Sequence, residues 1–109
     1  MRATVMALMI GLAIPAAAAA QDAKVTKGAE VYAAQKCALC HSIGDKGNKK
    51  GPLDGVGSKL KAAEIREWMT DAKGMTAKTK ATRKPDMKSY ALPADELDAI
   101  VAYLTSLKK

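Results

Sequence analysis

The chain has 109 residues, of which 49% are hydrophobic and 27% are charged, and its formal net charge is +7. This length and balance predict one small globular domain and exclude a disordered tail or a fibre. Aromatic residues make up only 4% of the chain, and phenylalanine does not occur. Because a domain this small buries a modest share of its surface, we expect a disulfide, a metal or a cofactor to supplement its core.

Residues 1–20 have the organisation of a secretory signal peptide. A basic residue at position 2 precedes an apolar run over residues 5–14, and Pro15 and five alanines follow this run. For the alternative, an uncleaved membrane anchor, the run is near the lower length limit and is interrupted by Gly11. We therefore predict that residues 1–20 are removed and that residues 21–109 form an exported domain without stable membrane insertion.

The first helix of the exported domain is predicted over Val25–Lys36. Gly28 and Tyr32 are four residues apart and therefore share one face of this helix. Glycine weakens a helix, so its presence here predicts close approach by another backbone. A flexible entry turn is the alternative interpretation of this glycine.

The two cysteines of the chain occur in the pentapeptide Cys37-Ala38-Leu39-Cys40-His41. A disulfide across two intervening residues closes a very short loop and adds little stability, and no strand pattern supports a thioredoxin-like pair. A zinc site needs four ligands, whereas the chain has one histidine and two cysteines. Two thiols at this spacing can add to the two vinyl groups of one porphyrin, and the adjacent imidazole then lies beneath the iron. The pentapeptide therefore predicts one covalently attached haem c.

Three elements are predicted between this motif and the last helix. Ser42–Gly57 holds five glycines and one proline, which indicates a loop. Ser58 is expected to cap a helix that runs to about Ala72. The apolar face of this helix has helical spacing and comprises Ile65, Trp68, Met69 and Ala72. Lys73–Tyr90 has no apolar period, so we expect a long irregular segment with a functional role there.

The last helix is predicted to have Pro93 in its first turn. Three acidic residues lie near its positive end and two lysines follow its negative end. Its apolar stripe comprises Leu97, Ile100, Val101, Leu104 and Leu107. The pattern contains no internal repeat and no linker, so the sequence predicts a single all-α domain.

A second protein ligand to a haem iron would have to come from a residue other than histidine, because His41 is the only histidine. Three methionines remain after removal of the signal peptide. Met69 lies on the apolar helix face, where a core methionine is the ordinary interpretation, and nothing fixes the backbone of Met75. Met87 follows Pro85 in the rigid end of the irregular segment and is the predicted ligand. Met75, Met69, a lysine and an open position stay as alternatives.

The chain resembles the class I monohaem c-type cytochromes of bacteria over essentially its whole exported part. The resemblance depends on Gly28 and Tyr32, Cys37-Ala38-Leu39-Cys40-His41, Gly51-Pro52, Pro85-Asp86-Met87 and Ala94–Leu104. It implies a cytochrome c-like fold of three to four helices wrapped around one covalently attached haem. Gly28 and Tyr32 would then meet Ala99–Tyr103 where the first and last helices cross. Lys88 departs from the family pattern, because many relatives have proline after the methionine ligand.

The resemblance also implies roles for two residues near the haem. The carbonyl oxygen of Pro52 would accept a hydrogen bond from Nδ1–H of His41, which fixes the imidazole tautomer and strengthens the histidine as a ligand. Trp68 would either contact a haem propionate or pack against the haem edge.

A haem iron bound by both His41 and Met87 has no open position for a substrate, and it barely rearranges when an electron moves. The thioether raises the reduction potential relative to ligation by two nitrogens. We therefore predict a periplasmic electron carrier rather than an enzyme. One alternative is a haem subunit docked permanently on a larger oxidoreductase. Another is a sensor or gas-binding haem with a weak sixth ligand.

The excess positive charge is concentrated on Lys73–Tyr90, which has six basic side chains and one acidic side chain. In the family fold this segment borders the exposed haem edge. We therefore expect a monomer that meets redox partners with acidic docking surfaces, with a strong dependence on salt. A generically solvated basic loop is the alternative. Nucleic-acid binding is not expected, because the chain is exported and has no recognised binding motif.

Overall fold

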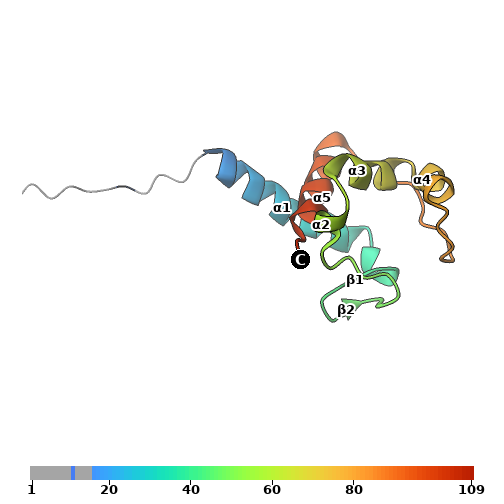
Figure 1. The fold of residues 1–109 in the computed structure, drawn as a ribbon. Helices are drawn as coiled ribbons and strands as arrows, with labels where there is room; N and C mark the ends of the chain where they lie inside the picture. The colour runs from blue at the N-terminus through green and yellow to red at the C-terminus, as the bar shows by residue number, and fades with distance from the viewer. Residues whose placement is uncertain (1–10, 12–15) are drawn as a thin grey trace, which may run out of the picture.

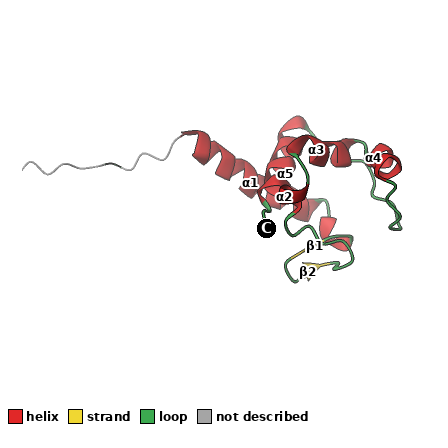
Figure 2. Cartoon of the chain, viewed as in Figure 1, coloured by secondary structure: helices red, strands yellow, loops and turns green. Residues whose placement is uncertain are grey.

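Helices form most of the regular structure in residues 11 and 16–109, the part of the chain that this computed structural model describes (Figures 1 and 2). The helices are α1 (Ala16–Ala34), the short 3₁₀ helix η1 (Cys37–Leu39), α2 (Val56–Lys59), α3 (Ala62–Thr70), α4 (Ala72–Thr79) and α5 (Ala94–Ser106). Two short antiparallel strands, β1 (Ser42–Ile43) and β2 (Lys46–Gly47), occur where only a loop was expected. The predicted all-α fold class is confirmed.

α1 and α5 cross at the centre of the fold (Figure 1). At the crossing, a Cβ atom added to Gly28 would lie 2.1 Å from the carbonyl oxygen of Ala99, so only glycine allows this approach. One turn further along α1, the rings of Tyr32 and Tyr103 pack edge to face with their centroids 5.8 Å apart. The predicted meeting of Gly28 and Tyr32 with the last helix is therefore confirmed, and the entry-turn interpretation of Gly28 is wrong.

α1 is longer at its N-terminus than the predicted helix, because it begins at Ala16 and ends at Ala34. Alanine has the highest helix propensity, so the run Ala16–Ala20 continues the helix backwards. The predicted signal peptide lies mostly outside the described residues, of which it contains only Gly11 and Ala16–Ala20. None of the helices in residues 16–109 combines the length and the apolar character needed to cross a membrane.

The helix predicted from Ser58 to Ala72 is divided into α2 and α3, which corrects the prediction. Leu60 between them is extended, and the backbone N–H of Lys61 donates to Oε1 of Glu64 at the start of α3 (3.2 Å). The hydroxyl oxygen of Ser58 accepts from the backbone N–H of Lys109 (3.0 Å) instead of capping a helix. A contact with the far end of the chain therefore decides how the Ser58 side chain is used.

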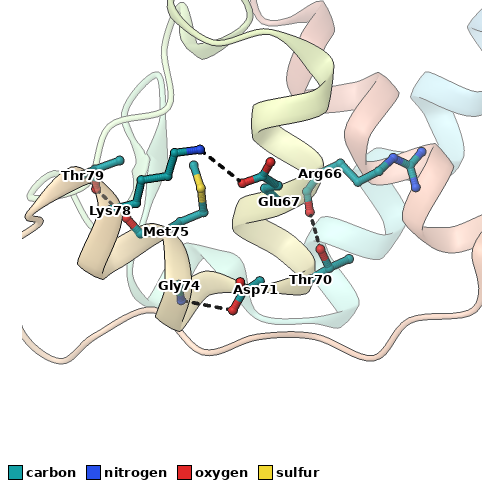
Figure 3. A network of polar contacts seen from close by, with 8 residues as sticks. All are labelled: Arg66, Glu67, Thr70, Asp71, Gly74, Met75, Lys78 and Thr79. Atoms are coloured by element: carbon teal, nitrogen blue, oxygen red, sulfur yellow. Dashed lines mark hydrogen bonds and ion pairs between the residues drawn. The ribbon is translucent and has the colours of Figure 1, made fainter.

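α4 occupies the first part of the segment that was expected to be irregular. Asp71 caps it by accepting a hydrogen bond from the backbone N–H of Gly74 (3.1 Å), and Lys78 forms an ion pair with Glu67 of α3 (Figure 3). Ala72 and Met75 are buried. The Asp71 cap and the burial of these two residues, three positions apart, stabilise α4. The chain that follows it, residues 80–93, has no helix or strand.

α5 has the predicted start, with Pro93 at its N-cap. Ile100, Val101 and Leu104 of its apolar stripe are at most 7% exposed. They pack in a core cluster with Val31, Ile65 and Met69. Two ion pairs fasten α5 to its neighbours: Lys27 of α1 bonds to Asp95 (2.5 Å), and Arg66 of α3 bonds to Asp98.

Candidate haem-binding site

A cavity of about 540 Å³ lies among α1, η1, α3, α5 and the segment after α4. Five of the predicted site residues line it: Cys37, Cys40, His41, Trp68 and Met87. The rest of the wall is mainly apolar and includes Leu53, Val56, Leu60, Ile65, Met69, Tyr90, Ile100 and Leu104. Its volume and its apolar lining with a few polar groups are typical of a cofactor site.

The two cysteines are presented by a tight turn directly after α1. Lys36 has a left-handed backbone (φ 57°), which turns the chain out of α1 and into η1. The backbone N–H of His41 donates to the carbonyl oxygen of Cys37 (2.9 Å), which keeps the pentapeptide compact. Both cysteines are free, and Cys37 is half-buried while Cys40 is exposed. Burial raises the pKa of the Cys37 thiol.

The imidazole of His41 is held by the segment around Gly51. Its Nδ1 lies 3.0 Å from the carbonyl oxygen of Gly51, which also accepts from the backbone N–H of Ser42 (3.0 Å). A carbonyl oxygen only accepts, so Nδ1 carries the hydrogen and Nε2 keeps its lone pair for a metal. Burial lowers the pKa of His41, and the charge of Arg83 lowers it further while the Gly51 bond opposes both. The imidazole is therefore neutral and ready to ligate.

The acceptor for His41 corrects the prediction for Pro52, which is exposed and is not part of the cavity wall. A parallel bridge between Ser42 and Pro52 sets the register of the two segments, and in this register Gly51 lies beside the imidazole. A Cβ atom on Gly51 would lie 2.3 Å from the carbonyl oxygen of Cys40. The glycine therefore lets the two segments approach closely enough for the hydrogen bond.

The methionines are separated by their positions relative to the cavity. Of the three methionines in the described part of the chain, Met69 and Met87 line the cavity and Met75 does not. Met75 is buried on α4 (4% exposed). Met69 belongs to the core cluster on α3, whereas Met87 is half-buried on the segment after α4. The sulfur that combines access to the cavity with a place outside the helical core is therefore that of Met87.

Aromatic side chains complete the wall. Trp68 is half-buried on α3 and lines the cavity, and its contact with a haem stays a prediction. Tyr90 was not predicted as a site residue, although an aromatic residue soon after Met87 in a polar segment could have suggested it. Its backbone N–H donates to the carbonyl oxygen of Met69 (2.7 Å), which draws the end of the segment against α3. The hydroxyl of Tyr32 is buried at the wall without a partner among the described residues, and burial raises its pKa to about 12.

These residues fit a covalently attached haem. Two free thiols and a neutral imidazole lie on one short turn, a thioether lies on another segment, and apolar side chains surround the space between them. The buried hydroxyl of Tyr32 is a polar atom of the wall left for a group in the cavity or an ordered water.

A small helical domain with a Cys-X-X-Cys-His turn at the edge of such a cavity is a class I c-type cytochrome. Comparison with known protein families agrees, because the family model for Cytochrome c matches residues 25–108, and the chain belongs to this family. No curated protein and no solved structure matches the chain. Membership means that the protein carries haem c, covalently bound and containing iron, and that it transfers electrons with redox partners.

Proposed function

We propose that this cytochrome is a free periplasmic electron carrier whose haem iron is ligated by His41 and Met87. The observation that carries the proposal is that Met87 lines the same apolar cavity as the turn Cys37–His41, which we call the attachment turn. The haem supplies one-electron chemistry, since its iron alternates between the ferric and ferrous states.

The residues of the chain have three tasks in this proposal. Cys37 and Cys40 form the thioether bonds that keep the cofactor in place through each cycle. His41, oriented by Gly51, would hold the iron through Nε2, and Met87 would hold it through a sulfur that favours the ferrous state. An iron held by both residues would have no open position for a substrate, which favours electron transfer over catalysis. The apolar wall, including Trp68, keeps water away from the cofactor.

Partner recognition is assigned to the basic segment Lys73–Tyr90. Its six basic side chains are all exposed: Lys73, Lys78, Lys80, Arg83, Lys84 and Lys88. Arg83 and Lys88 of this segment line the cavity together with Asp86, so positive charge predominates where the segment borders the cavity. Such a field attracts partners with acidic docking surfaces and accelerates encounter, and salt weakens the attraction.

The periplasmic location is proposed from the sequence of residues 1–20. Their basic start, apolar run and alanine-rich end are those of a cleaved export signal. The mass of the exported protein tests this, because cleavage after Ala20 leaves a haem-carrying chain that begins at Gln21. Retention of the first 20 residues would contradict the proposal.

The ligation is tested with Met87→Ala, with Met75→Leu as the matched control. We expect Met87→Ala to lose the thioether-to-iron charge-transfer band of the ferric protein, and Met75→Leu to keep it. A band that survives in Met87→Ala would refute the assignment. Rapid binding of carbon monoxide by the ferrous parent at neutral pH would indicate a sensor with a weak ligand instead.

The carrier is distinguished from a permanently docked subunit by size-exclusion of the native protein. A free carrier elutes as a monomer, whereas a subunit co-purifies with catalytic chains.

A further inference from the structure

One basic side chain of the segment after α4 contacts the attachment turn directly. Nη1 of Arg83 donates a hydrogen bond to the carbonyl oxygen of Cys40 (2.5 Å), across 43 residues of sequence. The same nitrogen is the nearest atom to the place that a Cβ atom of Gly51 would take, at 2.1 Å. The guanidinium group of Arg83 therefore lies against the Cys40 carbonyl and against Gly51, whose carbonyl oxygen is the partner of the His41 imidazole.

The segment that holds Met87 has few other ties to the rest of the domain. It is fastened at its start, where the backbone N–H of Ala81 donates to the carbonyl oxygen of Thr76 (3.0 Å). At its end, the hydroxyl oxygen of Ser89 accepts from the backbone N–H of Ala72 (2.9 Å), and the backbone N–H of Tyr90 donates to the carbonyl oxygen of Met69 (2.7 Å). Among the described residues, the side chains of residues 82–88 form two hydrogen bonds. Arg83 donates to Cys40 outside the segment, and Lys84 donates to Asp86 within it. Arg83 is thus the tie in the middle of the segment.

We infer that Arg83 is a positioning residue that fastens the Met87 segment to the haem-attachment turn and so keeps Met87 available to the iron. This inference rests on the proposed ligation by Met87. Without the Arg83 hydrogen bond, the segment would be tied only at its ends and would sample more conformations than it does with the bond. In some of these conformations Met87 would lie away from the iron. The guanidinium is suited to this task because it is always charged and its planar fork holds several donors in a fixed geometry, so that one of them stays directed at the carbonyl.

The inference predicts competition by an added ligand. An external ligand such as imidazole binds the iron only when Met87 has left, so its apparent affinity rises with the fraction of molecules in which the methionine is detached. Loss of one charge-assisted hydrogen bond changes such an equilibrium by about tenfold. A reduction in net charge alone has no comparable effect on a neutral ligand.

The experiment titrates imidazole into the ferric holoprotein and follows the thioether-to-iron band. We expect Arg83→Ala to bind imidazole about tenfold more tightly than the parent, and Arg83→Lys to lie between them because the charge remains but the fork is lost. Lys59→Ala is the control, because Lys59 is an exposed basic residue on α2, outside the cavity wall, and we expect its imidazole affinity to equal that of the parent.

The Met87→Ala variant distinguishes a failure of the role of Arg83 from a failure of the proposed ligation by Met87. If Arg83→Ala binds imidazole like the parent while Met87→Ala binds it far more tightly, the role of Arg83 is refuted and the ligation by Met87 stands. If the parent already binds imidazole as tightly as Met87→Ala, the ligation itself is refuted. If Arg83→Ala does not accumulate with haem attached, Arg83→Gln is titrated instead, and parental affinity in that variant overturns the inference.

Discussion

The crossing of α1 and α5 leads to a prediction for Gly28→Ala. In an isolated helix this change is stabilising by about 1 kcal/mol, because alanine is the better helix former. Here the new Cβ atom would lie 2.1 Å from the carbonyl oxygen of Ala99 and 2.5 Å from Cβ of Tyr103, whereas real Cβ contacts are essentially never shorter than 3.0 Å. The two helices must therefore separate by about 1 Å.

The cost of this separation exceeds the gain in helix propensity. The obstacle is backbone rather than the end of a flexible side chain, so we place it at the upper end of the range for overpacking, about 3 kcal/mol. The net loss in the free energy of unfolding is then about 2 kcal/mol. For a domain of this size it corresponds to a decrease in Tm of roughly 8–16 °C.

The assay is thermal and denaturant unfolding of the ferric holoprotein, with Gly74→Ala as the matched control. Gly74 also lies within a helix, but the three atoms nearest to its added Cβ atom all belong to the exposed side chain of Asp71. This side chain can move at the cost of the cap of α4, and the gain in helix propensity offsets that cost. We expect this control to stay within about 1 kcal/mol of the parent. If Gly28→Ala is as stable as the control, the helix separation is not determined by Gly28 and the argument from close approach fails.

Two further predictions concern hydrogen bonds of the site and of the α1–α5 contact. Gly51→Ala should push the Gly51 carbonyl away from Nδ1 of His41 and raise the reduction potential. The hydrogen bond makes the imidazole a stronger donor, a stronger donor favours the ferric state, and this preference is weakened when the bond is lost. An unchanged potential and an unchanged imidazole NMR signal would contradict this. The hydrogen bond from Lys27 lowers the pKa of Asp95 below its ordinary value. The carboxylate therefore adds stability above about pH 4, and this contribution is lost as the pH falls from there through the lowered pKa of the folded protein. Asp95→Asn should therefore flatten the decrease in unfolding free energy between pH 6 and pH 3, and parallel curves for variant and parent would refute the assignment.

Much of the site could be predicted from the sequence because its chemistry is local. The cysteines and the histidine of the attachment turn are neighbours in sequence, and their spacing allows two thiols and an imidazole to reach one porphyrin. The start of α5 and its buried stripe also follow from local features: Pro93, the acidic first turn and helical spacing of apolar residues. Gly28 was informative for a similar reason, since a glycine inside a helix has a cost that a close contact must offset.

Other features were decided by contacts between residues far apart in the chain. Ser58 looked like a helix cap, but the C-terminal Lys109 engages its hydroxyl, and the predicted helix is divided at Leu60. The acceptor for His41 is Gly51 rather than Pro52, because a bridge between two segments sets the register by one residue.

For the methionines too, residue chemistry named the candidates and contacts between distant segments separated them. Three were candidates by chemistry alone, and periodicity does not separate Met75 from Met87. Met75 is buried because Asp71 caps α4, a helix that the apolar pattern of the segment does not predict. The sequence by itself determined the cofactor class and the helical fold, since both depend on residue types at short spacing. The tertiary structure decided that Met69 and Met87 line the cavity while Met75 does not, which carbonyl accepts from the imidazole, and which arginine contacts the attachment turn, because each depends on how distant segments pack.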